Sequence, residues 1–350
     1  MDTESVSKVR YQVSVRIEES AVEVNLSGII SARALDVVLT EMVRTKGRSN
    51  FVDNDCRLVV DLSQVKAVMP SGATSLVSLC SALMEHKIGD LARPSIIELR
   101  RPPSHVLTYL TRIGFFTAMA SKADLVGCTD LVRTEEEKAS RSTAKDPKDI
   151  WDRQERDNKP VVWPISLIGH KESHRTRLDF DCFCQRLVNN AAQHFEGLFA
   201  SPHFNFDGRD MHDFLLSNYE LYMNVFDHSK SWGLTMIHAR PKYGTFVCCH
   251  DIGIGVRENV KSSPKVKSSF SKDSDAIRWA LTEGNSSRID GNGLGLNIVE
   301  DFVCSRKGML EIRSGECLMQ RSPRNVNWRS HHVPWFPGTQ INLFVPVRSG

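Results

Sequence analysis

The chain has 350 residues, 41% of them hydrophobic and 25% charged, with a formal net charge of +3. This length exceeds what one core usually holds and predicts two domains, and so mild a charge, without a basic stripe interleaved with aromatics, does not indicate binding to nucleic acid or an anionic membrane. The polar start and the lack of an uninterrupted apolar span of ~18 residues indicate neither a signal peptide nor a membrane-spanning helix. Nine cysteines, an odd number scattered through apolar segments, favour reduced thiols. We therefore expect a cytoplasmic protein.

The N-terminal third predicts alternating strands and helices. Hydrophobic periodicity predicts strands at 21–27, 56–62 and 95–99, and helices at 32–44 and 73–87. The loop before the second helix reads Val65-Lys-Ala-Val-Met-Pro-Ser-Gly72. Ser71 in this loop is a favoured helix N-cap, whose hydroxyl would satisfy an otherwise unpaired amide. The alternative is a phosphoacceptor, and one serine could do both.

This pattern resembles the STAS domain of anti-sigma-factor antagonists, in which a strand, a short Asp-Ser-Ser-Gly-like loop and a helix carry a phosphorylated serine. Ser71 matches that serine because it directly precedes the glycine, whereas Met69 and Pro70 replace the usual acidic and small residues. The resemblance implies a mixed sheet with helices over residues 9–125 and a regulatory protein partner.

A charged stretch follows the STAS-like segment. Between Arg133 and Lys159 the residues are mainly Glu, Lys, Arg, Ser and Asp, with almost no aliphatic side chains. Such a composition cannot bury enough apolar surface to order itself. We therefore expect a solvated linker, partly helical or disordered, over residues 126–164.

A helical pattern then carries three polar residues on one stripe. Glu220, Asn224 and His228 are four residues apart, which places them on one helix face. The other positions are largely apolar, so a carboxylate and a carboxamide buried there would need partners, which a metal and a polar ligand could supply. The alternative is an exposed helix edge that carries a Glu and an Asn.

Two glycine motifs come after this helix. A β-prone run, 243–250, leads into Asp251-Ile-Gly-Ile-Gly255, although such a motif alone is more often a turn than a site. Gly291-Asn-Gly-Leu-Gly295 precedes a helical pattern at 294–303. Glycines before a helix N-terminus can form an anion site, because free amides and the helix dipole face the anion. No Lys-Ser/Thr follows, so the loop differs from a Walker A motif.

The three motifs in this order resemble the Bergerat-fold (GHKL) ATP-binding domain shared by gyrase, a heat-shock chaperone, histidine kinases and MutL. The resemblance covers residues 165–347 and implies an α/β sandwich that binds ATP and Mg²⁺. It implies that Asn224 holds Mg²⁺, that Glu220 is the general base, and that Asp251 accepts the adenine amino group. The remaining nucleotide-binding residues that it implies are Gly253, Gly255, Gly291, Gly293, Leu294, Gly295 and Thr339.

Residues close to these motifs indicate which branch of this superfamily the chain resembles. His228 together with Asn224 resembles the anti-sigma-factor serine kinases, whereas Asp227 resembles gyrase, MutL and the chaperone. Arg288 and the lysines between 257 and 290 could reach phosphate oxygens from a mobile lid, or could lie in a solvated loop. We expect no further domain after residue 347, and the gyrase-type branch needs one.

The leading function is therefore ATP- and Mg²⁺-dependent phosphotransfer to a protein serine, which controls partner switching. A second possibility is an ATPase or nucleotide-sensing switch that phosphorylates no protein. A third is a non-catalytic STAS scaffold with a decayed nucleotide pocket. Homodimer formation stays open. An aromatic insertion, 327–336, precedes the expected final strand and could bind a partner or pack onto its own domain.

Overall fold

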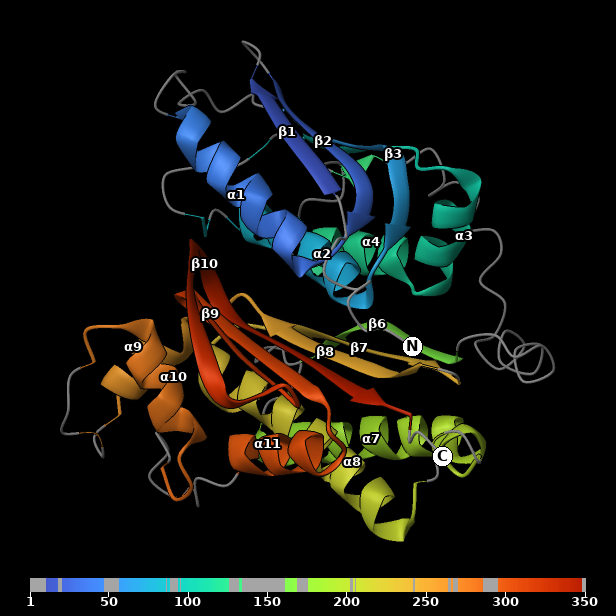
Figure 1. Ribbon diagram of the computed structural model, residues 1–350. Coiled ribbons are helices and arrows are strands. Elements are labelled where there is room, and N and C mark those ends of the chain that lie inside the picture. Colours follow the sequence, from blue (N-terminus) through green and yellow to red (C-terminus); the bar gives the residue numbers. More distant parts are fainter. Residues whose placement is uncertain are drawn as a thin grey trace. The chain divides into compact units, whose positions relative to one another are not determined.

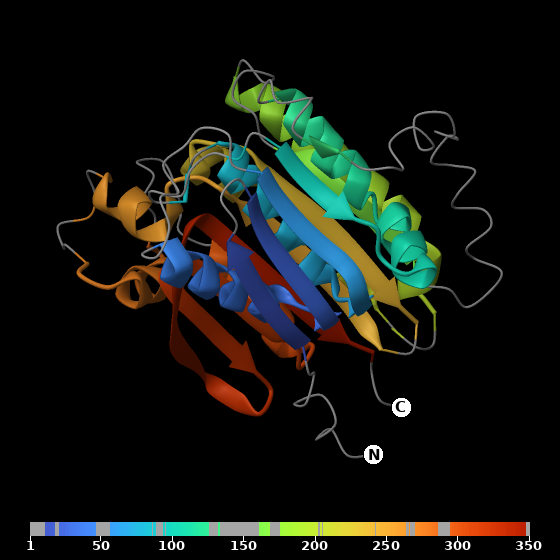
Figure 2. The ribbon, with the colours of Figure 1, turned by 90° about the horizontal axis from the view of Figure 1, so that it is seen from above.

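The computed structural model describes residues 11–17, 21–46, 57–85, 87–88, 94, 96–125, 132–133, 161–168, 176–201, 204, 206–241, 243–263, 266, 270–285 and 295–347. The chain divides into two compact units, Met1–Asp146 and Pro147–Gly350. Each unit contains a five-stranded sheet with helices (Figures 1 and 2). The α/β class predicted from the sequence is confirmed.

The sheet of the first unit is mixed. Its order is β1 (Tyr11–Ile17), β2 (Ala21–Ile30), β3 (Arg57–Val68), β4 (Ile96–Arg100) and β5 (Val132–Arg133). β1 and β2 are antiparallel, and the other neighbouring strands are parallel. Parallel neighbours need crossover connections, which contain α1 (Ala32–Lys46), α2 (Pro70–Met84), and the pair α3 (Ser104–Arg112) and α4 (Phe115–Leu125).

The sheet of the second unit is entirely antiparallel. Its order is β6 (Val161–Ile168), β7 (Gly233–Arg240), β8 (Gly244–Asp251), β10 (Asn325–Pro346) and β9 (Met309–Ser322). Three helices cover one face: α7 (Arg177–Phe199), α8 (Gly208–Asn224) and α11 (Gly295–Ser305) (Figure 1). A π-helical turn, η3 (Val225–Ser229), continues α8, and the short helices α9 (Gly255–Lys261) and α10 (Asp273–Leu281) lie between β8 and α11 in the sequence. This is the predicted α/β sandwich.

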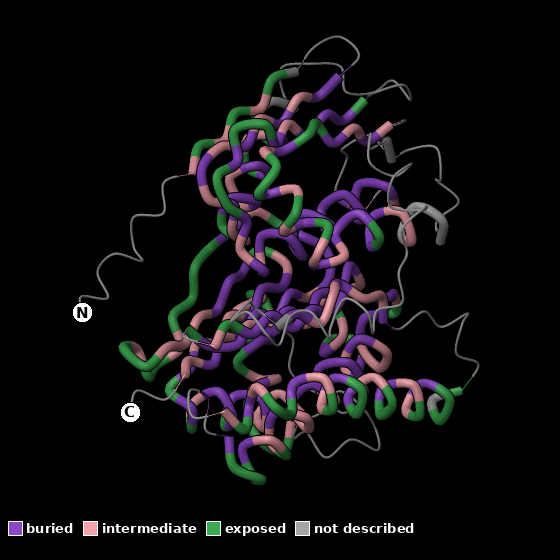
Figure 3. Tube along the Cα trace, turned by 90° about the vertical axis from the view of Figure 1, so that its right-hand side faces the viewer, coloured by how far each residue is buried: buried purple, intermediate pink, exposed green. Residues whose placement is uncertain are grey.

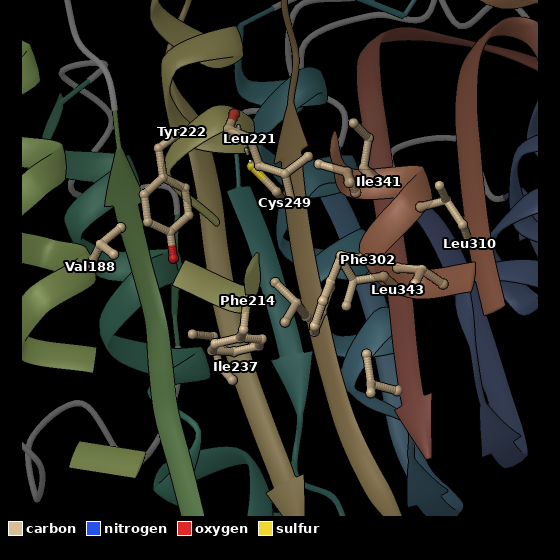
Figure 4. Packing of buried hydrophobic residues seen from close by; sticks show 14 of the residues in the cluster. Val188, Phe214, Leu221, Tyr222, Ile237, Cys249, Phe302, Leu310, Ile341 and Leu343 are labelled. Carbon is tan, nitrogen blue, oxygen red and sulfur yellow. Dashed lines mark hydrogen bonds between the residues drawn. The ribbon is translucent and has the colours of Figure 1, made fainter. Parts of the chain in front are cut away.

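The core of the second unit lies between its sheet and these three helices. Figure 4 shows Phe214, Leu221 and Tyr222 of α8 and Phe302 of α11 among the inward-facing side chains of the strands. Ile237, Cys249, Ile341 and Leu343 supply that sheet face. Along the helical turns, buried and exposed residues alternate (Figure 3). The amphipathic pattern of these helices therefore fixes which of their residues face the sheet and which face away from it.

Several element bounds differ from the sequence prediction. β3 continues past Leu62 to Val68, and α2 begins at Pro70. The stretch expected to be wholly linker contains β5, which pairs with β4, and the start of β6. The expected aromatic insertion is part of the long strand β10.

Neither a membrane-spanning helix nor a disulfide is found among the described residues. No helix among them is long and apolar enough to cross a membrane. Every cysteine in the same ranges has a free thiol, and most of these thiols are buried.

Candidate functional site

The polar residues of α8 lie where the helix changes its winding. An Asp207–Asp210 capping box starts the helix: the Asp210 amide donates to Asp207 Oδ1 at 2.8 Å, and the Asp207 amide donates to Asp210 Oδ2 at 3.2 Å. The helix passes at Asn224 into the π turn that contains Asp227 and His228, and Lys230, which caps the turn, lies in the left-handed region with φ 55°. Such π turns are frequent at functional sites.

Gly295 brings the N-terminus of α11 against this end of α8. A Cβ at this position would lie 2.6 Å from Glu220 Oε2 and 3.8 Å from Asn224 Nδ2. Glu220 and Asn224 are both half-buried. A side chain at position 295 would therefore collide with the Glu220 carboxylate, which lies against the first turn of α11. Gly295, the last residue of the third sequence motif, therefore lies beside two residues of the first.

The Asp251 motif is attached to the same π turn. Asp251 is the last residue of β8, is 7% exposed, and accepts a hydrogen bond on Oδ1 from the Gly253 amide at 2.8 Å. The Ser229 carbonyl accepts a bond from the Ile254 amide at 3.1 Å. A Cβ on Gly253 would overlap the Ser229 backbone, so only glycine permits this approach.

The segment before Thr339 lies beside Asp251. Gly338 has a φ of +76°, and a Cβ on it would lie 2.6 Å from Asp251 Oδ1. The Ser314 hydroxyl donates to the Gly338 carbonyl at 3.0 Å and accepts from the Val256 amide at 2.9 Å. Thr339 is half-buried and pairs with Ser314 across the two strands. Ser314 thus holds the start of α9 to the strand that carries Thr339.

The stretch between the second and third motifs is partly helical. Arg257 of α9 forms an ion pair with Asp273 of α10, with an Nε–Oδ1 distance of 3.3 Å. The Asp273 carboxylate also accepts from the Glu316 amide on β9 at 2.8 Å. Lys261 and Lys272 are exposed. The segment predicted as a mobile lid therefore contains two helices, which β9 anchors through Asp273.

Burial controls protonation on the α7 side of this region. Tyr219 donates to Asp181 Oδ1 at 2.7 Å, and desolvation, followed by the Asp181 carboxylate, raises its pKa. Desolvation raises the pKa of the Cys184 thiol to about 12, with smaller contributions from Asp181 and Asp227. Both groups therefore stay neutral at physiological pH.

The remaining predicted site residues of the second unit are His228, Arg288 and those of the glycine loop before α11. His228 lies in the π turn, and its carbonyl accepts a hydrogen bond from Asn259 Nδ2 at 3.0 Å. Among the described residues, no group of three His, Cys, Asp or Glu side chains could hold a metal ion. The predicted residues Arg288, Gly291, Gly293 and Leu294 lie outside the described residues.

Sequence reasoning missed three residues that connect the motifs, namely Ser229, Asn259 and Ser314. Ser229 and Asn259 act through hydrogen bonds that involve the main chain of the π turn, and such bonds leave no spacing pattern. Ser314 offered one signal, because its strand must pair with the strand of Thr339.

Ser71 in the first unit is not the N-cap of α2. Met69 occupies the N-cap position without a side-chain hydrogen bond, and Pro70 takes the first helical position, which its fixed φ favours. Ser71 is half-buried in the first turn, so the N-cap prediction was wrong. The Met69 amide donates to the Ile30 carbonyl at 2.7 Å, and a Cβ on Gly72 would overlap that same carbonyl. The loop is therefore packed tightly against the end of β2.

The solved structures that are similar to part of this chain include two anti-sigma factor antagonists. No family model matches the sequence, and no curated protein matches it. The anti-sigma factor antagonist SpoIIAA in its unphosphorylated form is similar over 39% of this chain and 98% of its own, with 14% identity and a TM-score of 0.21. An anti-sigma factor antagonist from Mycobacterium paratuberculosis is similar over 38% of this chain and 95% of its own, with 20% identity and a TM-score of 0.22.

Proposed function

We propose that the second unit binds ATP with Mg²⁺ and transfers the γ-phosphoryl group to a serine of a protein, and that this transfer controls a partner-switching interaction. The observation that carries the proposal is the close approach of Gly295 to Glu220 and Asn224, which leaves no room for a Cβ. A carboxylate and a carboxamide there face the N-terminus of a helix. The combination suits a site for a phosphate and its metal ion.

The residues fit these ligands chemically. A Cβ at 295 would lie 2.6 Å from Glu220 Oε2, so only glycine lets this carboxylate lie against the first turn of α11. The Asn224 side-chain oxygen is a suitable ligand for Mg²⁺, which when bound would neutralise charge on the transferring phosphoryl group. Oδ1 of Asp251 is fixed by the Gly253 amide. The Asp251 carboxylate would accept the adenine amino group.

In phosphoryl transfer the protein mainly positions the reactants, stabilises charge and accepts a proton. Glu220 would accept the proton of the acceptor serine hydroxyl as the serine oxygen forms its bond to the γ-phosphorus. The bond between that phosphorus and the β,γ-bridging oxygen breaks, and ADP leaves. The amides at the start of α11 would bind the phosphate charge throughout.

Ser71 is the acceptor that this chain itself offers. A phosphate in the first turn of α2 would be stabilised by the positive end of the helix dipole. Because Gly72 packs against the Ile30 carbonyl, added bulk and charge at Ser71 would alter the exposed surface of this loop. A regulatory protein that binds the STAS-like surface or the ATPase surface would sense that change.

One observation favours a second function, in which ATP is hydrolysed or merely sensed without protein phosphorylation. Asp227 follows Asn224 by three residues, as in gyrase and the chaperone, and Met69 and Pro70 depart from the usual phosphoacceptor loop. Under this alternative, nucleotide binding would act through the segment of α9 and α10. A scaffold with a decayed pocket is disfavoured, because the motif residues that the structure describes converge.

Labelled ATP separates these functions. Purified protein is incubated with γ-labelled ATP and Mg²⁺, with wild type compared to Glu220→Ala, Asn224→Ala and Ser71→Ala, and with exposed Glu258→Ala as the control. Labelled protein that disappears in Glu220→Ala supports the kinase, and loss in Ser71→Ala locates the acceptor. Free phosphate without labelled protein supports hydrolysis. If wild type binds no ATP, both functions fail.

A further inference from the structure

The β9–β10 hairpin extends well beyond the rest of its sheet. β8 pairs with β10 only from Gln340 to Pro346, whereas the pairing of β9 with β10 continues out to Ser322 and Asn325. Among the described strands, residues 325–336 of β10 therefore have β9 as their only neighbour. One edge of this two-stranded extension, here called the basic ribbon (residues 317–336), offers its backbone groups to another strand.

The basic ribbon is held rigidly from its inner side. Trp328 Nε1 donates to Glu300 Oε1 of α11 at 3.0 Å, and Arg321 forms an ion pair with the same carboxylate. Arg313 donates to the Pro334 carbonyl at 2.8 Å and lies 5.2 Å from the centroid of the Phe336 ring. An edge fixed in this way loses little conformational entropy when a partner strand is added.

The outward residues of the ribbon are basic or apolar. Val326 is 67% exposed and Trp335 is 45% exposed. The other exposed side chains include Arg324, Arg329, His331 and His332. No Asp or Glu follows Glu316 in the sequence. The ribbon therefore combines an unpaired strand edge, exposed apolar side chains and charged side chains that are all basic.

We propose that the basic ribbon is a docking edge for an extended, acidic segment of another protein, which adds to it as a further strand. Backbone hydrogen bonds would give affinity, and carboxylates beside Arg324 and Arg329 would give specificity. A second copy of this chain would bring the same cations to the edge, so repulsion disfavours self-pairing. Of the Trp and Phe side chains in this fully described ribbon only Trp335 is exposed, so the ribbon lacks the row of exposed aromatics on which successive bases would stack, and a protein strand is favoured over a nucleic acid.

A labelled peptide tests this surface in the full chain. The probe is a fluorescein-labelled peptide of alternating Glu and Val, and its controls are the alternating Lys and Val peptide and an N-methylated form of the acidic peptide. Anisotropy should show binding of the acidic peptide alone, weakened when ionic strength rises from about 0.05 to about 0.5 M. Arg324→Glu/Arg329→Glu should weaken binding by about tenfold or more.

The matched control is Arg186→Glu/Arg209→Glu, which changes net charge equally on the exposed surfaces of α7 and α8. It should bind the peptide as wild type does, and circular dichroism should show both double variants folded. The proposal is overturned if the acidic peptide does not bind, if both double variants weaken it equally, or if the N-methylated peptide binds as well. Tighter binding of a single-stranded oligonucleotide through the same two arginines would overturn it in favour of a nucleic acid. Each of these measurements concerns the basic ribbon alone, so its result does not depend on whether the protein binds ATP.

Discussion

Substitution of Gly295 with alanine probes the meeting point of α8 and α11 most sharply. The added Cβ would lie 2.6 Å from Glu220 Oε2, so the carboxylate would have to retreat by roughly 1 Å to reach ordinary contact distance. Folding should suffer little, because a Glu side-chain end can move and Ala is a better helix former than Gly by about 1 kcal/mol. Misplacement of the base by roughly 1 Å should lower the rate of phosphoryl transfer on the order of 100-fold.

Single-turnover transfer from γ-labelled ATP measures this effect, with Gly197→Ala in α7 as the control, since a Cβ at 197 has nothing within 4 Å. The control should retain the wild-type rate. Because the clash acts through Glu220, adding Gly295→Ala to Glu220→Ala should lower the rate little further. A wild-type rate in Gly295→Ala, or an equal loss in both backgrounds, would refute the reasoning.

Three other outcomes are expected. Gly338→Ala forces a side chain into a φ of +76° against Asp251, so it should cost about 1–3 kcal/mol of stability and weaken nucleotide binding; an unchanged melting temperature would contradict this. Arg306→Met leaves the buried Asp210 carboxylate without its guanidinium partner, which lies 2.9 Å away in wild type, so urea denaturation should show a loss of about 3–5 kcal/mol; a loss below about 1 kcal/mol would argue against it. Desolvation lowers the pKa of His194 from 6.5 to about 4, so stability that is present above pH 6.5 should fall as the pH drops from 6.5 toward 4. His194→Phe should make urea midpoints less sensitive to pH over this range, and an unchanged sensitivity would count against the assignment.

Regular periodicity made much of the fold predictable. The predicted helix at 294–303 and strand at 243–250 correspond closely to α11 and β8. β3 was predicted to end too early, because its pairing with β2 shifts register twice, between Asn25 and Ser27 and between Gly28 and Ile29. Such irregularities break the alternation of buried and exposed residues on which the prediction depends.

The basic ribbon was harder to predict for a different reason. Polar residues and Pro334 made 327–336 look like an insertion rather than a strand. A proline is tolerated there because that part of β10 lies at a sheet edge, where a missing amide donor breaks no pairing. Edge position depends on the whole sheet, so the local sequence does not encode it.

The candidate site was predictable where side chains define it and not where the main chain does. Helical spacing placed Glu220 and Asn224 together, and the glycine motifs indicated close approach of backbone. The contacts of Gly253 with Ser229 and of Gly338 with Asp251 join residues distant in sequence through carbonyl groups. Every residue carries a carbonyl, so these partners have no signature in the sequence.

The central claim is that the second unit binds ATP together with Mg²⁺. Calorimetric titration of the full chain with ATP, with and without Mg²⁺, tests it most directly when wild type is compared with Asn224→Ala. Wild type should bind ATP more tightly with Mg²⁺ than without, and Asn224→Ala should lose that difference while it remains folded. The absence of ATP binding by wild type, or an Mg²⁺ effect that persists in Asn224→Ala, would contradict the account.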